Sequence, residues 1–273
     1  MTDRYALFGN PARHSKSPKI HAAYALETGQ DLTYEVIEPP LDGFVAAVAA
    51  FRASGGRGGN VTMPFKLEAF ALATDLSERG RLAGAVNTLK FDGDRIRADN
   101  FDGVGLVNDI RRNIGLPIQG RRVLVLGAGG AVRGALLPIL EQRPALLVVA
   151  NRTVAKATAL GEQFAGCGEF VTCGYPDLGD EAFDLVVNAT SASMRGELPP
   201  VTRAAFAPGC VAYDLVYGKG LTPFLALARD SGARRLADGV GMLVEQAAEG
   251  FEWWRGVRPS TRAVIDSLAV PLG

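Results

Sequence analysis

Residues 123–134 read Val123-Leu124-Val125-Leu126-Gly127-Ala128-Gly129-Gly130-Ala131-Val132-Arg133-Gly134. The first four form a continuous apolar run, which is typical of a central strand in a parallel sheet. The glycines that follow open a predicted helix, where backbone N–H groups can approach a pyrophosphate. This order of strand, loop and helix predicts a dinucleotide site. Val132 stands where a third glycine is usual, and a tight strand-to-helix turn would explain the same residues.

The strand after this loop, predicted over 145–150, bears on the kind of nucleotide. A site for NAD usually ends this strand with an acid that binds the ribose hydroxyls, but here the chain continues Asn151-Arg152-Thr153. Arg152 and Lys156 offer positive charge where a 2′-phosphate would lie, and a guanidinium suits phosphate geometry. The sequence therefore favours NADP over NAD, with a solvated helix start as the alternative for both cations.

Apolar runs alternate with helical patterns on both sides of the loop, which predicts an α/β fold. After residue 104 this alternation indicates a doubly wound Rossmann sheet, and before it a mainly parallel α/β sheet that the purely helical tail from about Val240 completes. Asp92-Gly93-Asp94 predicts a hairpin turn. We expect two domains, 1–103 plus 240–273 for the substrate and 104–239 for NADP. The expected strands cover 5–8, 33–37, 60–62, 183–188 and 211–214, and the expected helices 18–28, 41–52, 104–113 and 154–164.

Charge and composition exclude several classes of protein. The 273 residues include 29 Lys plus Arg and 29 Asp plus Glu, so no global field attracts nucleic acid or anionic lipid. The N-terminus lacks the pattern of a signal peptide, and no apolar run approaches the roughly 18 residues that span a bilayer. We expect a cytoplasmic protein. Its three cysteines show no CxxC spacing, so neither disulfides nor a metal are predicted.

Lys66 is the candidate for acid/base chemistry. In Thr62-Met63-Pro64-Phe65-Lys66 it falls in the first turn of a helix, where the positive end of the dipole should disfavour the ammonium and lower the lysine pKa. Such a lysine either extends to solvent or takes part in proton transfer. The segment Asp99-Asn100-Phe101-Asp102-Gly103 lies at the predicted domain junction, where α/β enzymes form clefts, although a capping turn would also explain it.

Other polar residues have simpler structural explanations. Ser17 before Pro18 is the arrangement of a helix N-cap and a first-turn proline, and Ser15 is a loop hydroxyl. Asn87 can be a turn residue. Gln246 can be one polar position on a buried helix.

Taken together, these stretches resemble shikimate dehydrogenases over nearly the whole chain. The matching segments, in family order, are Phe8-Gly9-Asn10-Pro11, His14-Ser15-Lys16-Ser17-Pro18, Asn60-Val61-Thr62-Met63-Pro64-Phe65-Lys66, Ala83-Gly84-Ala85-Val86-Asn87-Thr88, Gly127-Ala128-Gly129-Gly130-Ala131, Asn151-Arg152-Thr153, Asn188-Ala189-Thr190-Ser191, Tyr213-Asp214 and Gly241-Met242-Leu243-Val244-Glu245-Gln246-Ala247-Ala248.

The resemblance implies reversible NADP(H)-dependent reduction of 3-dehydroshikimate to shikimate, a step of aromatic amino acid biosynthesis. It places Lys66 and Asp102 at the reacting carbon. The implied substrate-binding positions are Ser15, Ser17, Thr62, Asn87, Phe101, Tyr217 and Gln246. The implied NADP-binding residues are Gly127, Ala128, Gly129, Gly130, Ala131, Asn151, Arg152, Thr153, Lys156, Thr190, Gly239 and Met242.

Phe101 departs from the family pattern, which usually has Thr between the Asn and the Asp of this segment. The resemblance assigns that hydroxyl to the substrate, and losing a polar partner at a desolvated site costs on the order of 1 to 3 kcal/mol. We hypothesise that Phe101 weakens the use of shikimate. One alternative is a divergent shikimate or quinate dehydrogenase-like enzyme with another ring acid as substrate. Another is a non-catalytic NADP(H)-binding regulator, against which the intact Lys66 and Asp102 argue. Monomer and homodimer both stay open.

Overall fold

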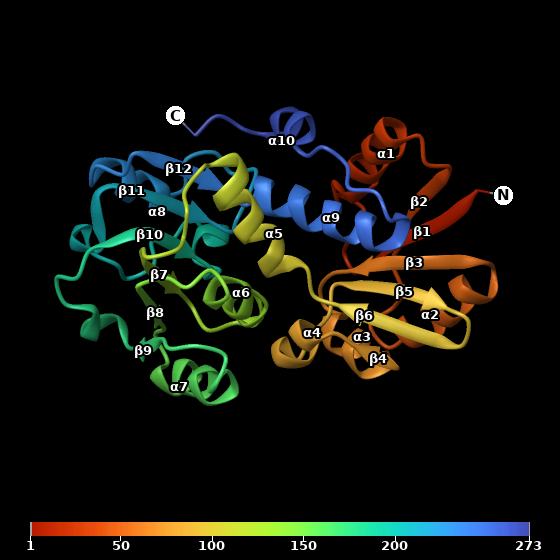
Figure 1. Ribbon diagram of the computed structural model, residues 1–273, viewed down its shortest axis with the longest axis horizontal. Coiled ribbons are helices and arrows are strands. Elements are labelled where there is room, and N and C mark those ends of the chain that lie inside the picture. The colour runs from red at the N-terminus through yellow and green to blue at the C-terminus, as the bar shows by residue number, and fades with distance from the viewer. Residues whose placement is uncertain (1, 273) are drawn as a thin grey trace. The chain divides into compact units, whose positions relative to one another are not determined.

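The structure, a computed structural model that describes residues 2–272, divides into two compact units (Figure 1). Unit 1 contains the chain up to Asp102 together with Val244–Val264. Unit 2 contains Gly103–Leu243 together with the residues from Ile265 onward. The expected division kept 240–273 in one piece, whereas these boundaries fall inside α9 (Val240–Arg255) and α10 (Arg262–Leu268). Within residues 2–272, no helix is both long enough and apolar enough to cross a membrane.

Unit 2 is built on a six-stranded sheet in which every neighbouring pair is parallel. The strand order is β9-β8-β7-β10-β11-β12, so the order reverses between β7 and β10. This is the doubly wound arrangement that the alternating pattern predicted. The strands are β7 (Arg122–Leu126), β8 (Leu146–Ala150), β9 (Val171–Cys173), β10 (Phe183–Asn188), β11 (Phe206–Asp214) and β12 (Arg235–Asp238).

Helices connect these strands and bury their central residues. Leu124, Val149 and Val186 are fully buried, as expected for strands covered on both faces. The predicted helix over 104–113 begins earlier, at Asp102, and its last turn is π-helical. The helical segments are α5 (Asp102–Asn108), η1 (Asp109–Asn113), α6 (Gly130–Leu140), α7 (Val154–Gln163), η2 (Tyr175–Leu178), η3 (Ser193–Arg195), η4 (Arg203–Ala205) and α8 (Pro223–Asp230).

Unit 1 has a mixed six-stranded sheet in the order β2-β1-β3-β5-β6-β4. The β1–β2, β1–β3 and β4–β6 pairs are parallel, whereas β5 runs antiparallel to both β3 and β6. The hairpin predicted at Asp92-Gly93-Asp94 joins β5 to β6, with Gly93 at φ 54°. The elements are β1 (Asp3–Phe8), α1 (Ser17–Thr28), β2 (Leu32–Ile37), α2 (Phe44–Ala53), β3 (Gly56–Val61), α3 (Lys66–Leu72), β4 (Asp75–Leu76), α4 (Glu78–Ala83), β5 (Thr88–Asp92) and β6 (Arg95–Asp99).

The glycine-rich stretch before Asn60 is part of strand β3, although the sequence predicted a strand only over 60–62. A Cβ at Gly58 would lie 2.4 Å from the carbonyl oxygen of Leu89, and one at Gly59 would lie 2.4 Å from that of Ala6. Only glycine fits such close approaches to the neighbouring strands. These glycines therefore belong to a tightly packed central strand and do not mark a loop.

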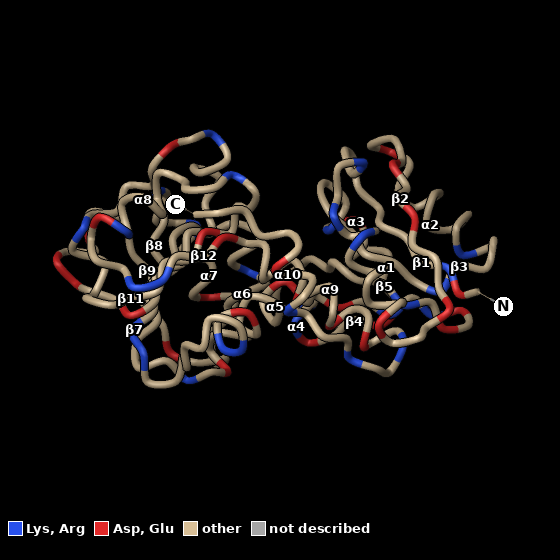
Figure 2. Tube along the Cα trace, turned by 90° about the horizontal axis from the view of Figure 1, so that it is seen from above, with Lys and Arg blue, Asp and Glu red and all other residues tan. Residues whose placement is uncertain are grey.

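Aromatic side chains dominate the core of unit 1. Phe8 meets the rings of Phe44 and Phe51 edge to face, and Phe44 stacks on Phe65. Phe65 directly precedes Lys66, so burial of this ring anchors the start of α3. Lys and Arg are interspersed with Asp and Glu along the trace of each unit (Figure 2), and the chain holds 29 of each sign.

Candidate active site

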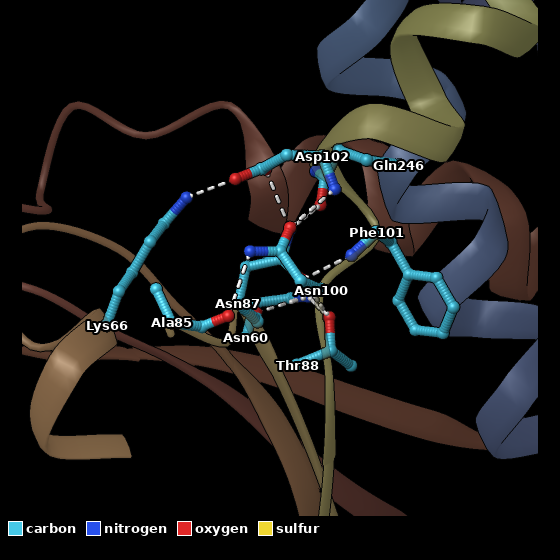
Figure 3. Close-up of polar contacts among 9 residues, drawn as sticks. All are labelled: Asn60, Lys66, Ala85, Asn87, Thr88, Asn100, Phe101, Asp102 and Gln246. Carbon is cyan, nitrogen blue, oxygen red and sulfur yellow. Dashed lines mark hydrogen bonds and ion pairs between the residues drawn. The ribbon is translucent and has the colours of Figure 1, made fainter. Parts of the chain in front are cut away.

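The centre of the candidate site in unit 1 is an ion pair between Lys66 and Asp102 (Figure 3). The Nζ atom of Lys66 lies 2.5 Å from Oδ2 of Asp102. The side chains are 29% and 16% exposed, so the pair is partly shielded and still reachable by a ligand. Lys66 is the first residue of α3 and Asp102 the first of α5, so helix starts place both groups.

Asn87 holds the other oxygen of the Asp102 carboxylate. Its Nδ2 atom donates to Oδ1 of Asp102 at 2.8 Å and to Oε1 of Gln246 at 3.3 Å. Its Oδ1 atom accepts from the backbone N–H of Phe101 at 3.0 Å. Because that N–H can only donate, it fixes which way the amide faces. The structure thus brings together Lys66, Asp102, Asn87 and Gln246, four of the residues that the sequence singled out.

Asn100 and Asp99 position the segment that carries Asp102. The Asn100 side chain donates to the carbonyl of Ala85 at 3.0 Å and accepts from the N–H of Asp102 at 3.1 Å. The carboxylate of Asp99, 6% exposed, accepts from Ser77 and from Arg79. These roles of Asn100 and Asp99 were not assigned from the sequence. The polar run from Asp99 to Asp102 was the only signal for them, and it named no partners.

The ring of Phe101 is buried, 4% exposed, and Figure 3 shows it directed away from the Lys66 ammonium. It meets Trp253 edge to face, with 5.8 Å between ring centroids, and the Arg79 guanidinium lies 5.3 Å from its centroid. Its backbone N–H supports Asn87, as described above. The aromatic ring therefore packs on unit 1 and its bulk does not cover the ion pair.

Ser15, Ser17 and Thr62 lie on two segments of unit 1 near the carboxyl ends of β1 and β3. Ser15 donates to the hydroxyl of Ser17 at 3.1 Å, and its own hydroxyl accepts from the backbone N–H of Ser17 at 3.2 Å. The predicted N-cap role of Ser17 is not seen, because α1 starts at Ser17 itself and Lys16 is the N-cap residue. A Cβ at Gly9 would lie 2.3 Å from Cγ2 of Thr62, so only glycine there lets Thr62 take this position.

The glycine loop of unit 2 lies at the point where the strand order reverses. Gly127 follows β7, and Ala189 and Thr190 follow the adjacent strand β10. Gly127 has φ +113°, and a Cβ there would lie 3.3 Å from the carbonyl of Ala189 and 3.4 Å from Thr190. Ligands of open α/β sheets bind at such a switch point, outside the carboxyl ends of the strands.

The loop fits a dinucleotide phosphate. A Cβ built on Gly129 or Gly130 would meet no other part of residues 2–272 within 4 Å, so packing does not require glycine at either position. Among the described residues, no side chain caps the N-terminus of α6, which leaves its first N–H groups for an anion. Open space beside glycines at an uncapped helix start is the arrangement expected for backbone N–H groups that bind a pyrophosphate.

The turn after β8 carries the residues expected at the NADP ribose. The Asn151 side chain donates to the carbonyl of Thr153 at 2.8 Å, which shapes this turn before α7. Arg152, Thr153 and Lys156 are exposed. No acid ends β8, and the guanidinium of Arg152 stays available to a phosphate.

A buried carboxylate, Asp214, ends strand β11, next to the end of β10. The sequence assigned it no role. It is fully buried and accepts from Ser193 at 2.5 Å, Thr222 at 2.8 Å and Asn188 at 3.2 Å. Burial raises the pKa of Asp214. Asn188 in turn accepts from the N–H and the hydroxyl of Thr190. Polar residues that end otherwise apolar strands were the signal for this network.

Tyr213 and Asp109 support the start of α9, where Gly239 and Met242 lie. The hydroxyl of Tyr213 donates to Asp109 at 2.7 Å and accepts from the N–H of Met242 at 3.0 Å. Burial, with the Asp109 carboxylate nearby, raises the pKa of Tyr213 well above its usual value. Tyr217 lies in the loop after β11 and is 42% exposed. Tyr217, Gly239 and Met242 all belong to unit 2.

A Rossmann sheet with an open glycine loop, in a chain that also holds a shielded lysine–aspartate pair, defines a dinucleotide-dependent oxidoreductase of the α/β class. Residues 7–89 match the shikimate dehydrogenase substrate binding domain, residues 110–196 match shikimate / quinate 5-dehydrogenase, and residues 239–268 match the shikimate 5'-dehydrogenase C-terminal domain. The chain belongs to the shikimate dehydrogenase family, as the sequence motifs predicted.

Individual relatives agree with this assignment. Shikimate dehydrogenase (NADP(+)) of Nitrosospira multiformis is 57% identical, over 100% of this chain and 99% of its own. The crystal structure of an Ael1 enzyme from Pseudomonas putida is 56% identical, covers 100% of both chains and superposes with a TM-score of 0.96. Shikimate 5-dehydrogenase from Thermus thermophilus in complex with NADP(H) and shikimate is 30% identical, over 98% of each chain, with a TM-score of 0.86.

Proposed function

We propose that this chain catalyses the reversible, NADP-linked reduction of 3-dehydroshikimate to shikimate. The observation that carries the proposal is the Lys66–Asp102 ion pair, oriented by Asn87 and backed by Gln246. A ketone that becomes a secondary alcohol needs a proton at its oxygen. A lysine ammonium that is held in place and partly shielded from water can supply that proton.

Lys66 and Asp102 divide the work at the substrate oxygen. In the direction of reduction Lys66 donates a proton as negative charge develops on the oxygen, and in oxidation it takes the hydroxyl proton back. Asp102 holds the Lys66 amine within hydrogen-bond distance and compensates its charge. The Asn87 amide keeps the carboxylate from rotating, because each carboxylate oxygen has its own donor.

We assign the ring acid to unit 1, with Ser15, Ser17, Thr62, Asn87 and Gln246 as hydrogen-bond donors. Hydroxyls and amides suit the uncharged ring hydroxyls of the acid, and serine hydroxyls can bind its carboxylate. Asn87 and Gln246 already contact each other at 3.3 Å, so two of these positions are adjacent in the structure.

We assign NADP to unit 2, with the pyrophosphate on Gly127–Ala131 and the 2′-phosphate on Arg152 and Lys156. Asn151 and Thr153 shape the turn beneath it, while Thr190, Gly239 and Met242 take the nicotinamide half. When bound, this cofactor supplies or accepts the hydride. The protein residues bind the phosphates with backbone N–H groups and cations.

The experiment that tests the function is steady-state oxidation of shikimate and of quinate by the purified protein, with NADP and NAD in parallel. We expect shikimate and NADP to give the highest kcat/KM. Absence of NADP-linked turnover on both acids would overturn the proposal.

Phe101 favours a second candidate, a divergent member of the family with weak shikimate activity and another ring acid as its main substrate. The expected hydroxyl is missing, and the ring that replaces it packs against Trp253 and Arg79. A panel of hydroxylated cyclic acids separates the candidates. The divergent enzyme would prefer a panel member to shikimate by kcat/KM.

A further inference from the structure

A chain of buried hydrogen bonds leads from Asn60, on strand β3, to the Lys66–Asp102 pair (Figure 3). The Asn60 side chain donates to the hydroxyl of Thr88 at 3.1 Å, and Thr88 donates to Oδ1 of Asn87 at 2.9 Å. Asn87 then donates to Asp102, which accepts from Lys66. Asn60, Thr88 and Asn87 are 4%, 0% and 3% exposed, so water does not compete for these bonds.

Two further side chains donate to the start of this chain. The Tyr34 hydroxyl lies 2.7 Å from Oδ1 of Asn60, and Nε2 of His21 lies 3.1 Å from the same oxygen. The bonds therefore form a continuous series from Tyr34 and His21, through Asn60, Thr88 and Asn87, to Asp102.

Two backbone groups fix the orientation of the Asn60 and Asn87 amides, because one can only accept and the other can only donate a hydrogen bond. The carbonyl of Asn87 can only accept, and Nδ2 of Asn60 faces it at 3.4 Å, so Oδ1 of Asn60 must face Tyr34 and His21. The N–H of Phe101 can only donate, so Oδ1 of Asn87 faces it and Nδ2 of Asn87 faces Asp102. Thr88 is left to accept from Asn60 and to donate to Asn87.

We propose that Asn60 and Thr88 are positioning residues, which hold the Asn87 amide and thereby the Asp102 carboxylate in the orientation that catalysis requires. The inference rests on the proposed function and names the residues that act behind its catalytic pair. Asn60 and Thr88 do not touch the Lys66–Asp102 pair themselves. They act through Asn87, whose Oδ1 accepts from Thr88 as well as from the N–H of Phe101, so loss of the Thr88 hydroxyl removes one of the two donors that hold the amide.

His21 suits this network because it does not change charge near neutral pH. Its ring stacks on Tyr34, with 4.2 Å between centroids, and lies against Phe251 and Trp254. Burial lowers the pKa of His21 to about 3, so Nε2 donates as the neutral ring. Its Nδ1 atom is buried and has no hydrogen-bond partner among residues 2–272, which fixes the proton on Nε2.

The test compares Thr88→Val, which has the same shape but no hydroxyl, with Thr88→Ser, which keeps the hydroxyl. In shikimate oxidation with NADP we expect Thr88→Val to lower kcat about tenfold, the value of one buried hydrogen bond, and to leave the KM for NADP unchanged. Thr88→Ser should restore kcat to within about twofold of the wild type. Thr74→Val is the matched control, because Thr74 bonds only the backbone of Ile96.

The outcomes separate this inference from the proposed function. A wild type without turnover of shikimate or quinate overturns the function and this inference with it. Wild-type turnover with an equal kcat for folded Thr88→Val overturns the positioning role alone. If Thr88→Val does not fold, Tyr34→Phe replaces it, because it removes a donor to Oδ1 of Asn60 at a half-buried side chain. Unchanged kcat and shikimate KM in Tyr34→Phe would then overturn the inference.

Discussion

Lys66 and Asp102, 36 positions apart in the chain, form an ion pair of 2.5 Å whose carboxylate has a separate donor on each oxygen. This geometry supports the proposal that Lys66 transfers the proton and that Asp102 holds the Lys66 amine in place. We therefore expect the two side chains to contribute to kcat and not to the binding of NADP.

Lys66→Ala should lower kcat for shikimate oxidation about 100- to 10,000-fold, the range for loss of a general acid or base. The dissociation constant for NADP, measured by titration of intrinsic fluorescence, should stay at the wild-type value. Lys19→Ala, which removes an exposed lysine from α1, is the control. A kcat for Lys66→Ala within a factor of a few of the wild type would exclude the proposed proton transfer.

Phe101→Thr and Phe101→Val separate the effects of the missing hydroxyl and of the buried ring. Both variants lose the contacts with Trp253 and Arg79, and each should be less stable by about 2 to 4 kcal/mol, because a cavity replaces the ring. Only threonine restores the hydroxyl, so kcat/KM for shikimate should be about tenfold higher in Phe101→Thr than in Phe101→Val. Equal values would show that the hydroxyl does not reach the substrate.

Arg152→Ala should weaken the preference for NADP. Loss of a charge-assisted bond to the 2′-phosphate should raise the KM for NADP about 10- to 100-fold. The KM for NAD serves as the internal control and should not change, because NAD lacks that phosphate. Lys156→Ala should have a smaller effect, since a single ammonium binds phosphate less specifically. A KM for NADP that is the same in Arg152→Ala and the wild type would refute the assignment.

His21 makes the stability of unit 1 depend on pH. Burial lowers its pKa from 6.5 to about 3, so below pH 6.5 the unfolded chain takes up a proton that the folded chain does not. The contribution of His21 is therefore complete above pH 6.5 and is lost as the pH falls toward 3. On acidification from pH 7 to pH 5, His21 should lower the free energy of unfolding by about 2 kcal/mol.

Urea unfolding of the wild type and of His21→Phe at these two pH values measures this contribution. The loss of stability on acidification should be smaller in His21→Phe by that amount. Phe251→Leu is the control, because it alters the packing around His21 without removing a titratable group. An equal pH dependence in the wild type and His21→Phe would contradict the prediction.

Local sequence was sufficient for the elements that repeat an apolar pattern. The apolar run at Val123 and the glycines after it predicted β7, the loop and α6, because the strand period and the need for close backbone approach leave a direct mark on residue types. Strand β3 was predicted only at its end, since Gly58 and Gly59 carry no side chains to show a pattern. Glycine is required at these positions because the neighbouring strands lie too close for a Cβ atom.

Some features of the candidate site could likewise be predicted from the sequence, and others could not. The residues along the chain were enough to predict the family, the order of strands and helices around the glycine loop, and the proposed catalytic residues Lys66 and Asp102. The folded chain was needed to show that Asn60 and Thr88 form hydrogen bonds that lead to Asn87 and that the ring of Phe101 packs against Trp253. These are contacts between distant segments, and the direction of a hydrogen bond depends on which donors and acceptors the fold brings within reach.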